Sequence, residues 1–237
     1  MRLLHCDLSG EAAPVLEEFY DEIPPYAILS HRWGKATEEV SFKDIETGAD
    51  IAKKEGYRKL QYCCQQALED GFKYVWIDTC CIDKSSSAEL SEAINSMYNW
   101  YMRSQVCYAY LNDASCPGSG NSSFRKSAWF TRGWTLQELI APENVTFFDQ
   151  YWRYIGDKHD LALLVSEITR INPEVLTSRV TKHSFVYKKR SCDNRLTTVY
   201  LLGNQLDRGA DFLLNLPISS QNVATLLISV TTNISCS

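Results

Sequence analysis

The sequence predicts an α/β protein with an open, flavodoxin-like parallel sheet and helices on both of its faces. Short, continuous apolar runs alternate along the chain with segments whose apolar residues recur at helical spacing. Strands that alternate with helices form β-α-β units, which produce a parallel sheet with right-handed crossovers. The 237 residues, of which 45% are hydrophobic, suffice for one domain with a substantial core.

Four apolar runs predict the strands of this sheet. Strands of a parallel sheet are buried on both faces, so they appear as continuous apolar runs rather than as alternating patterns. Trp76, inside the second run, is therefore expected in the core. The four runs are YAILS (Tyr26–Ser30), KYVWID (Lys73–Asp78), VCYAYL (Val106–Leu111) and NVTFFD (Asn144–Asp149).

Helices are predicted between these strands from periodicity and from end signals. The first ends at Gly71, a typical C-terminal cap, and the second begins at a capping box of Ser86 and Glu89. The string RGWTLQELIAP predicts a short helix ended by Pro142, and Asp157 is expected to cap a last helix. The expected apolar faces are Tyr57, Leu60, Cys64, Ala67 and Leu68 in the first helix, Leu90, Ile94, Met97 and Tyr101 in the second, and Leu161, Leu164, Ile168 and Ile171 in the last.

These patterns divide the chain into three parts. Residues 1–24 are expected to flank the domain, and residues 25–175 to form it. Within it, 31–53 is a long polar stretch that predicts a loop. Beyond about residue 180 no period is convincing, so 176–237 is expected to be a divergent or poorly ordered tail.

Composition narrows the classes of function. The formal net charge is −5 and no segment is a basic stripe, so nucleic acid is not an expected partner. No signal sequence and no apolar run of about 20 residues is present, so a cytoplasmic protein without a membrane span is expected. Nine cysteines include no C-x-x-C pair, so no metal site is predicted and the thiols are expected to be small buried residues.

Polar residues gather where the predicted strands end. In an open parallel sheet, ligands bind beyond the carboxyl ends of the strands. The first strand ends in Ser30, followed by Arg32 and Trp33, and the second ends in Asp78. Asp83 follows soon after the second strand, and Glu138 lies on the helix after the third; these six residues are the candidate site.

Three strings resemble the signature blocks of the fungal heterokaryon incompatibility (HET) domain. They are YAILSHRWG, YVWIDTCCIDK and RGWTLQELIAP, and the resemblance covers residues 26–154 in the expected order. It implies a domain for allorecognition and cell-death signalling, with self-association or other incompatibility proteins as its partners. The further Trp- and Arg-containing stretch that typically completes this domain is not found in residues 180–237.

HET domains in turn are similar to TIR domains. The string WTLQEL resembles the TIR pattern W-C-x-x-E-L, and Ser30 and Asp78 stand where TIR domains carry a serine and an acidic residue. The resemblance implies that Glu138 is catalytic for cleavage of NAD, which is then a substrate rather than a permanently bound cofactor. In that role Trp33 stacks on a ring and Arg32 pairs with a phosphate, whereas His31 pairs with a phosphate only when protonated.

Each of these residues also has a structural interpretation. Glu138 is equally explained by a salt bridge to Arg132, Asp78 by capping a loop amide, Ser30 by satisfying the backbone at the strand end, and Trp33 by packing in the core. If those interpretations hold, the alternative function is a TIR-like protein-protein interaction module without enzymatic activity.

Overall fold

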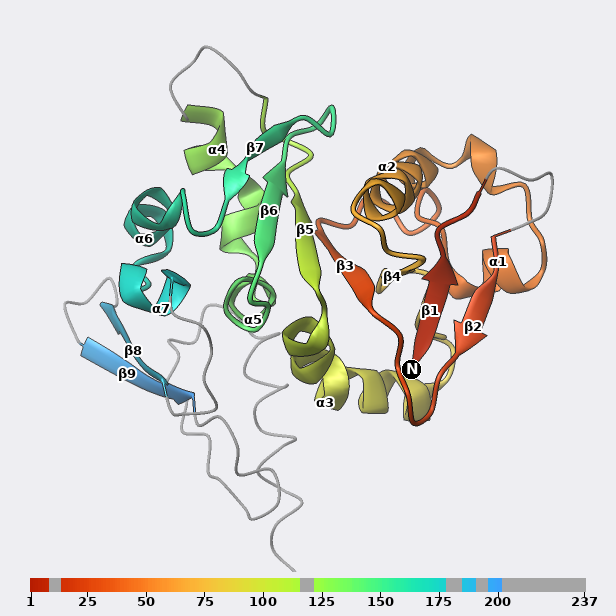
Figure 1. Ribbon diagram of the computed structural model, residues 1–237, viewed down its shortest axis with the longest axis horizontal. Helices are drawn as coiled ribbons and strands as arrows, with labels where there is room; N and C mark the ends of the chain where they lie inside the picture. Colours follow the sequence, from red (N-terminus) through yellow and green to blue (C-terminus); the bar gives the residue numbers. More distant parts are fainter. Residues whose placement is uncertain (9–13, 116–121, 178–184, 191–195, 202–237) are drawn as a thin grey trace, which may run out of the picture.

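The computed structural model describes residues 1–8, 14–115 and 122–177, together with the backbone of two strands at 185–190 and 196–201. Its centre is a seven-stranded sheet of order β2-β1-β4-β3-β5-β6-β7 (Figure 1). The strands are β1 (Arg2–His5), β2 (Leu16–Glu18), β3 (Tyr26–His31), β4 (Tyr74–Trp76), β5 (Val106–Tyr110), β6 (Val145–Phe148) and β7 (Tyr154–Asp157).

The middle of the sheet is parallel and its edges are antiparallel. Strands β4, β3, β5 and β6 pair in parallel, whereas β1, β2 and β7 pair antiparallel with their neighbours. All six residues of β3 are buried, as expected for a strand covered on both faces. The four predicted strands and the α/β class with a mostly parallel open sheet are thus confirmed.

The three antiparallel strands were not predicted. Residues 1–24, expected as a flank, contribute β1 and β2, and Leu3 and Leu4 of β1 are fully buried. The predicted cap at Asp157 is wrong, because this residue ends β7 and its side chain accepts a hydrogen bond from Thr146 on β6. Helix α6 (Ala162–Thr169) starts later, after Leu161, without a side-chain cap.

The helix between β3 and β4 largely follows the prediction. Leu60, Cys64 and Ala67 of α2 (Glu55–Glu69) are buried as expected, but Leu68 is 47% exposed and the buried stripe also takes in residues that were not predicted. The predicted loop 31–53 contains α1 (Phe42–Glu46), which Ser41 and Asp44 start with a capping box, and the 3-10 turn η1 (Ile51–Lys53). The buried members of the α2 stripe are Gly56, Lys59, Leu60, Cys63, Cys64 and Ala67.

The remaining helices follow the prediction in part. In α3 (Ser87–Arg103) the Ser86 hydroxyl accepts from the Glu89 backbone, but the Glu89 carboxylate pairs with Arg2 on β1, so only half of the predicted capping box forms. The third predicted helix is α5 (Thr135–Ile140). Shorter elements are α4 (Ser122–Lys126), the 3-10 turn η2 (Ala128–Thr131) and α7 (Pro173–Thr177).

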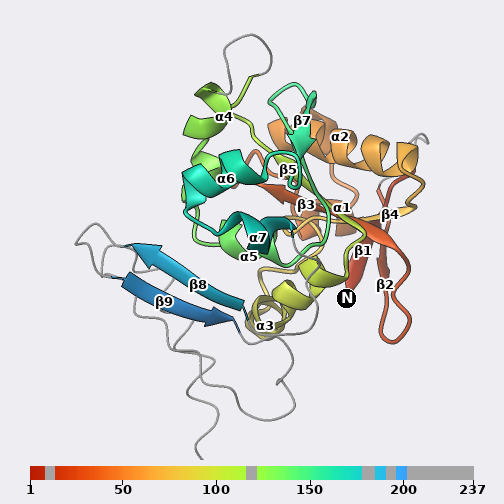
Figure 2. The same ribbon diagram turned by 60° about the vertical axis from the view of Figure 1, so that its left-hand side comes forward.

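Helices cover both faces of the sheet. In both views α2 lies on the opposite side of β3 and β5 from α5, α6 and α7 (Figures 1 and 2). The Tyr26 hydroxyl donates to the carbonyl of Trp100 on α3, and Ser30, on the same face of β3, bonds to α5. Helices α3 and α5 therefore share one face, because residues two and four apart on a strand point the same way.

The C-terminal part contains a separate hairpin of β8 (Phe185–Arg190) and β9 (Leu196–Leu201). The rest of the predicted tail lies outside the described residues. Among the described residues, six cysteines are free and buried, as expected, and Trp76 is fully buried in the core. The described part of the chain contains no helix that is long and apolar enough to cross a membrane.

Candidate functional site

Ser30 joins the central strand to the segment that carries Glu138. Its hydroxyl donates to Glu138 Oε2 at 2.6 Å and accepts from the Trp129 indole N–H at 2.8 Å. The two bonds connect the end of β3 to η2 and α5, which lie about 100 residues later in the chain. The structure therefore brings Ser30 and Glu138 together at the carboxyl ends of the parallel strands.

Glu138 is buried and its charge is compensated by Arg132. The residue is 4% exposed, and the two terminal nitrogens of Arg132 donate to its two oxygens at 3.0 and 3.3 Å. Burial raises the pKa of Glu138, while the charge of Arg132 and the hydrogen bond from Ser30 act in the opposite direction. The salt bridge given above as a structural explanation of Glu138 is thus present, alongside the contact with Ser30.

Asp78 follows β4 and holds the Trp33 side chain. Its Oδ2 accepts from the Trp33 indole N–H at 2.7 Å, rather than from a loop amide. Burial raises the pKa of Asp78 against the opposing charge of Lys84 and the bond from Trp33. Trp33 is 53% exposed, with the Lys84 ammonium 3.8 Å from its ring centroid, so its interpretation as a core residue is wrong.

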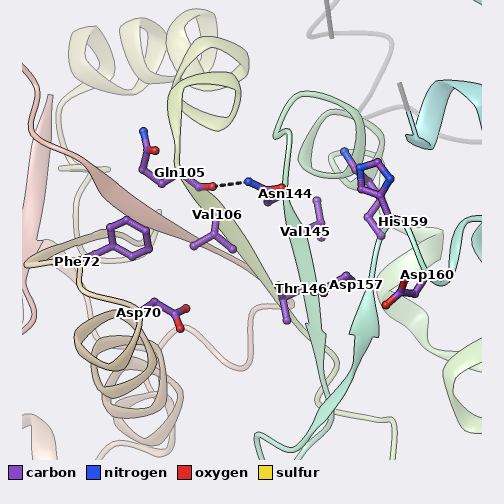
Figure 3. Close-up of a pocket in the computed structure, with 11 residues that line it drawn as sticks. Asp70, Phe72, Gln105, Val106, Asn144, Val145, Thr146, Asp157, His159 and Asp160 are labelled. Carbon is purple, nitrogen blue, oxygen red and sulfur yellow. Dashed lines mark hydrogen bonds between the residues drawn. The ribbon is translucent and has the colours of Figure 1, made fainter. Parts of the chain in front are cut away.

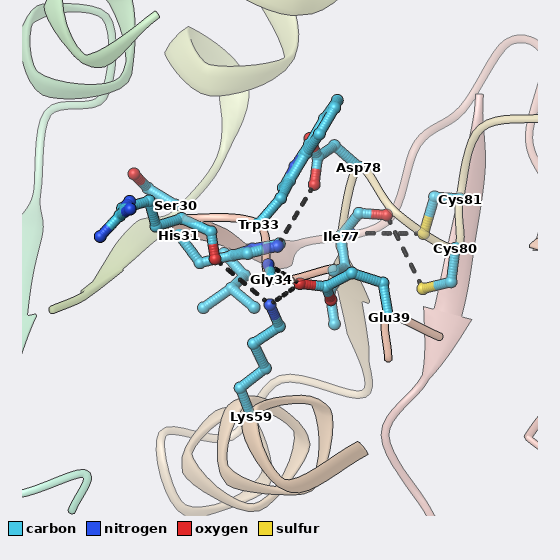
Figure 4. Close-up of polar contacts among 12 residues, drawn as sticks. Ser30, His31, Trp33, Gly34, Glu39, Lys59, Ile77, Asp78, Cys80 and Cys81 are labelled. Carbon is cyan, nitrogen blue, oxygen red and sulfur yellow. Dashed lines mark hydrogen bonds and ion pairs between the residues drawn. The ribbon is translucent and has the colours of Figure 1, made fainter. Parts of the chain in front are cut away.

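On the α2 side of β3, a second set of charged groups surrounds His31 (Figure 4). Lys59 from α2 donates to Glu39 Oε1 at 2.5 Å and to the Arg32 carbonyl at 3.4 Å, and the Gly34 amide donates to the same Glu39 oxygen. His31 Nε2 lies 3.7 Å from Asp78 Oδ1. Burial, helped by the charges of Lys59 and Arg132, holds the pKa of His31 well below its usual range. His31 is therefore neutral at pH 7 and does not supply a positive charge for a phosphate.

The other two predicted site residues lie at the rim without contacting Glu138. Arg32 has a half-exposed side chain whose Nη1 is 3.9 Å from a carboxylate oxygen of Asp113. Asp83 accepts from the backbone and hydroxyl of Ser85 within its own turn. Asp83 thus stabilises the turn between β4 and α3, and the Arg32 side chain remains 46% exposed.

Three residues of the network escaped prediction. Trp129, which is 1% exposed, binds Ser30, whereas Trp134 of the WTLQEL string is only partly buried at the start of α5. Lys59 and Glu39 form the buried ion pair on the α2 side of β3. Lys59 did carry a signal, because it falls within the apolar stripe of α2, where an unpaired lysine is rare. The positions of Trp129 and Trp134 in the sequence do not indicate which of the two side chains reaches Ser30.

A cavity of about 460 Å³ opens elsewhere, at the opposite edge of the sheet (Figure 3). Its lining includes Val106 and Val145, the first residues of β5 and β6. It therefore lies at the amino ends of the parallel strands and is not part of the candidate site.

Comparison with known proteins identifies the family. Residues 26–123 match the family model "Heterokaryon incompatibility protein (HET)". The chain is also 50% identical over 183 residues to the "Vegetative incompatibility protein HET-E-1" of Podospora anserina. The chain belongs to the HET family. The aligned region is 74% of this chain but 13% of that relative. No solved structure matches the chain significantly.

The matched HET range includes Ser30, Arg32, Trp33, Asp78 and Asp83 but ends before α5. Glu138 nevertheless forms one network with the HET segment through its bond to Ser30. The structural site of this HET protein therefore extends beyond the matched range.

Proposed function

We propose that this chain is the signalling domain of an incompatibility protein, and that it triggers cell death by cleaving the nicotinamide–ribose bond of NAD with Glu138. Membership of the HET family and the similarity to a vegetative incompatibility protein support the allorecognition role. The observation that carries the enzymatic part is the Glu138 carboxylate hydrogen-bonded to Ser30, where the parallel strands end. Self-association or another incompatibility protein is the proposed partner.

The proposed fold is TIR-like and flavodoxin-like. The parallel strands follow the spatial order β4-β3-β5-β6, in which the first of them in the chain lies second in the sheet. This order is the beginning of the flavodoxin-like arrangement 2-1-3-4-5, whose ligand site lies at the point where the strand order reverses. Ser30 and Asp78 end the two strands β3 and β4, and β3 is where the order reverses here.

The chemistry requires one carboxylate. As the glycosidic C–N bond breaks, its electron pair moves to the nicotinamide nitrogen, which loses its positive charge, so no general acid is needed. The ribose becomes oxocarbenium-like, and a carboxylate stabilises this cation or adds to it before water completes the hydrolysis to ADP-ribose and a proton. In the proposal Glu138 is this carboxylate, Trp33 stacks on a ring, Arg32 binds a phosphate and Asp78 positions Trp33.

A second candidate function is a non-enzymatic interaction module. The observation that favours it is the burial of Glu138, both of whose oxygens accept from Arg132 or Ser30. In this interpretation Glu138 fixes η2 and α5 against β3, and signalling depends on surface contacts alone.

Release of nicotinamide distinguishes the two functions. Purified chain, concentrated or clustered on beads, is incubated with NAD and the products are separated by chromatography. We expect wild-type protein to release nicotinamide and Glu138→Gln to release it at least about 100-fold more slowly, while Glu92→Gln, at an exposed position of α3, retains the wild-type rate. Circular dichroism checks that the fold persists. Absence of release by clustered wild-type protein would establish the interaction module instead.

A further inference from the structure

Arg132 stands between Glu138 and solvent. The side chain of Glu138 is 5% exposed and that of Arg132 is 20% exposed, so the guanidinium is the outer member of the pair. It donates to both carboxylate oxygens, while Ser30 holds one of them from the inside. A ligand that reaches Glu138 from solvent therefore has to displace Arg132.

Displacement leaves the buried Glu138 carboxylate without its partner and frees the Arg132 guanidinium. Leaving one member of a buried ion pair uncompensated is strongly unfavourable. A ligand that moves Arg132 away must thus bring a positive charge to Glu138, and the released Arg132 guanidinium becomes available to bind a negative group of the same ligand. A ligand with a single charge satisfies only one of the two groups.

We propose that the ligand of this site is a dinucleotide that carries both charges, and that it binds by exchanging the Glu138–Arg132 ion pair for two ion pairs of its own. The cationic nicotinamide ring of oxidised NAD takes the place of Arg132 beside Glu138, and the diphosphate takes the place of Glu138 at Arg132. This inference rests on the proposed NAD cleavage and adds that the site selects the oxidised, cationic cofactor over its reduced form. Arg132 is the specificity-determining residue.

The surrounding charges fit this arrangement. The charge of Asp78 raises the pKa of Glu138, so the two acidic groups together favour a cation at the inner position. Towards solvent, Arg32 is half exposed beside Asp113 and Lys84 lies over the exposed Trp33 ring, so two further cations lie where the strands end. The inner end of the site thus suits a positive ring and the outer end a diphosphate.

A series of four ligands tests the exchange on the unmodified chain. Isothermal titration calorimetry compares carba-NAD, which keeps both charges but resists cleavage, with NADH and ADP-ribose, which keep only the diphosphate, and with N1-methylnicotinamide, which keeps only the cation. We expect carba-NAD to bind at least about tenfold more tightly than each of the other three. Equal affinity for carba-NAD and NADH overturns the proposal, as does absence of binding by all four ligands.

Two variants assign the charges. Glu138→Gln removes the partner of the cation, so carba-NAD should lose its advantage over NADH. Arg132→Gln removes one partner of the diphosphate, so the affinity advantage of carba-NAD over N1-methylnicotinamide should shrink, whereas Arg132→Lys retains part of that advantage. Arg103→Gln, at an exposed position of α3, is the matched control and keeps the wild-type order. If Arg132→Gln does not fold, the affinities of the four ligands for the wild type and for Arg132→Lys still test the exchange of ion pairs.

The result is separable from the proposed cleavage. The expected affinities without any release of nicotinamide support the exchange and end the enzymatic proposal. Cleavage that depends on Glu138 but shows no preference for the oxidised cofactor in binding supports the enzyme and overturns the exchange.

Discussion

Lys158 should give this protein a measurable dependence of stability on alkaline pH. The residue follows β7, is 2% exposed, and its ammonium donates to the carbonyls of Leu139 and Pro142 at the end of α5, at 3.3 and 2.6 Å. Burial lowers the pKa of Lys158 from 10.5 to about 8. A shift of that size means that the folded state holds the charged form at a cost of about 3 kcal/mol relative to the unfolded chain.

The sign follows from proton binding. Between pH 8 and 10.5 the unfolded chain binds the Lys158 proton and the folded chain does not, so this group makes the protein more stable as the pH rises through that window. Below pH 8 Lys158 is protonated in both states, so its destabilising contribution to the free energy of unfolding no longer changes with pH. From pH 7.5 to 10 the free energy of unfolding contributed by Lys158 should increase by about 2 kcal/mol.

Lys158→Met removes this contribution. Urea denaturation of wild type and variant at several values between pH 7.5 and 10 gives the difference in their unfolding free energies, in which the titration of shared tyrosine and cysteine groups largely cancels. This difference should change by about 2 kcal/mol in favour of the wild type at high pH. Lys126→Met, at an exposed position of α4, should show no such change. A difference that stays constant with pH for Lys158→Met refutes the reasoning, whatever the absolute stability of the variant.

Two further predictions test the packing around α2. Gly56→Ala should destabilise the protein by about 1–3 kcal/mol in urea denaturation, because a Cβ would lie 2.8 Å from the backbone oxygen of Glu38 and from Glu39 Oε2. Helix propensity alone predicts that alanine stabilises the helix. A stabilised Gly56→Ala variant would therefore contradict the close packing at this position. The six described cysteines are buried, and burial raises the pKa of Cys63 and Cys107, so these thiols should react with Ellman's reagent only after unfolding. Rapid labelling of Cys63 in the native protein, located by mass spectrometry, would be incompatible with the described core.

The sequence was most informative about the parallel strands. Runs such as YAILS and VCYAYL are buried on both faces, and this produces a continuous apolar signal that does not depend on knowing the partner strands. The antiparallel strands β1, β2 and β7 have only three or four residues each, too few for a recognisable pattern. The edge strand β2, for example, is the polar triplet Leu-Glu-Glu. Pairing with a neighbour, rather than local sequence, makes them strands.

The candidate site was predictable to the extent that topology determines it. Residues that end parallel strands meet at one edge, which places Ser30 and Asp78 correctly, and the short helix after the third strand brings Glu138 to Ser30. The side-chain partners depend on rotamers and on three-dimensional neighbours, which spacing does not reveal. Trp129 is the example, because its bond to Ser30 spans 99 positions of sequence.

The alternation of β3 has a consequence for how this molecule responds to binding. Ser30 and His31 are consecutive, yet Ser30 contacts the α5 layer and His31 lies among the groups of the α2 layer. One peptide unit of β3 thus connects the Glu138 network with the buried network around His31. If a ligand at one network changes the affinity of the other network for its own ligand, thermodynamic reciprocity requires that the second ligand changes the affinity for the first by the same factor. Variants of Lys59 and Arg132 are therefore best made in combination, because their energetic non-additivity measures the coupling between the two networks, including the direct repulsion between these two cations.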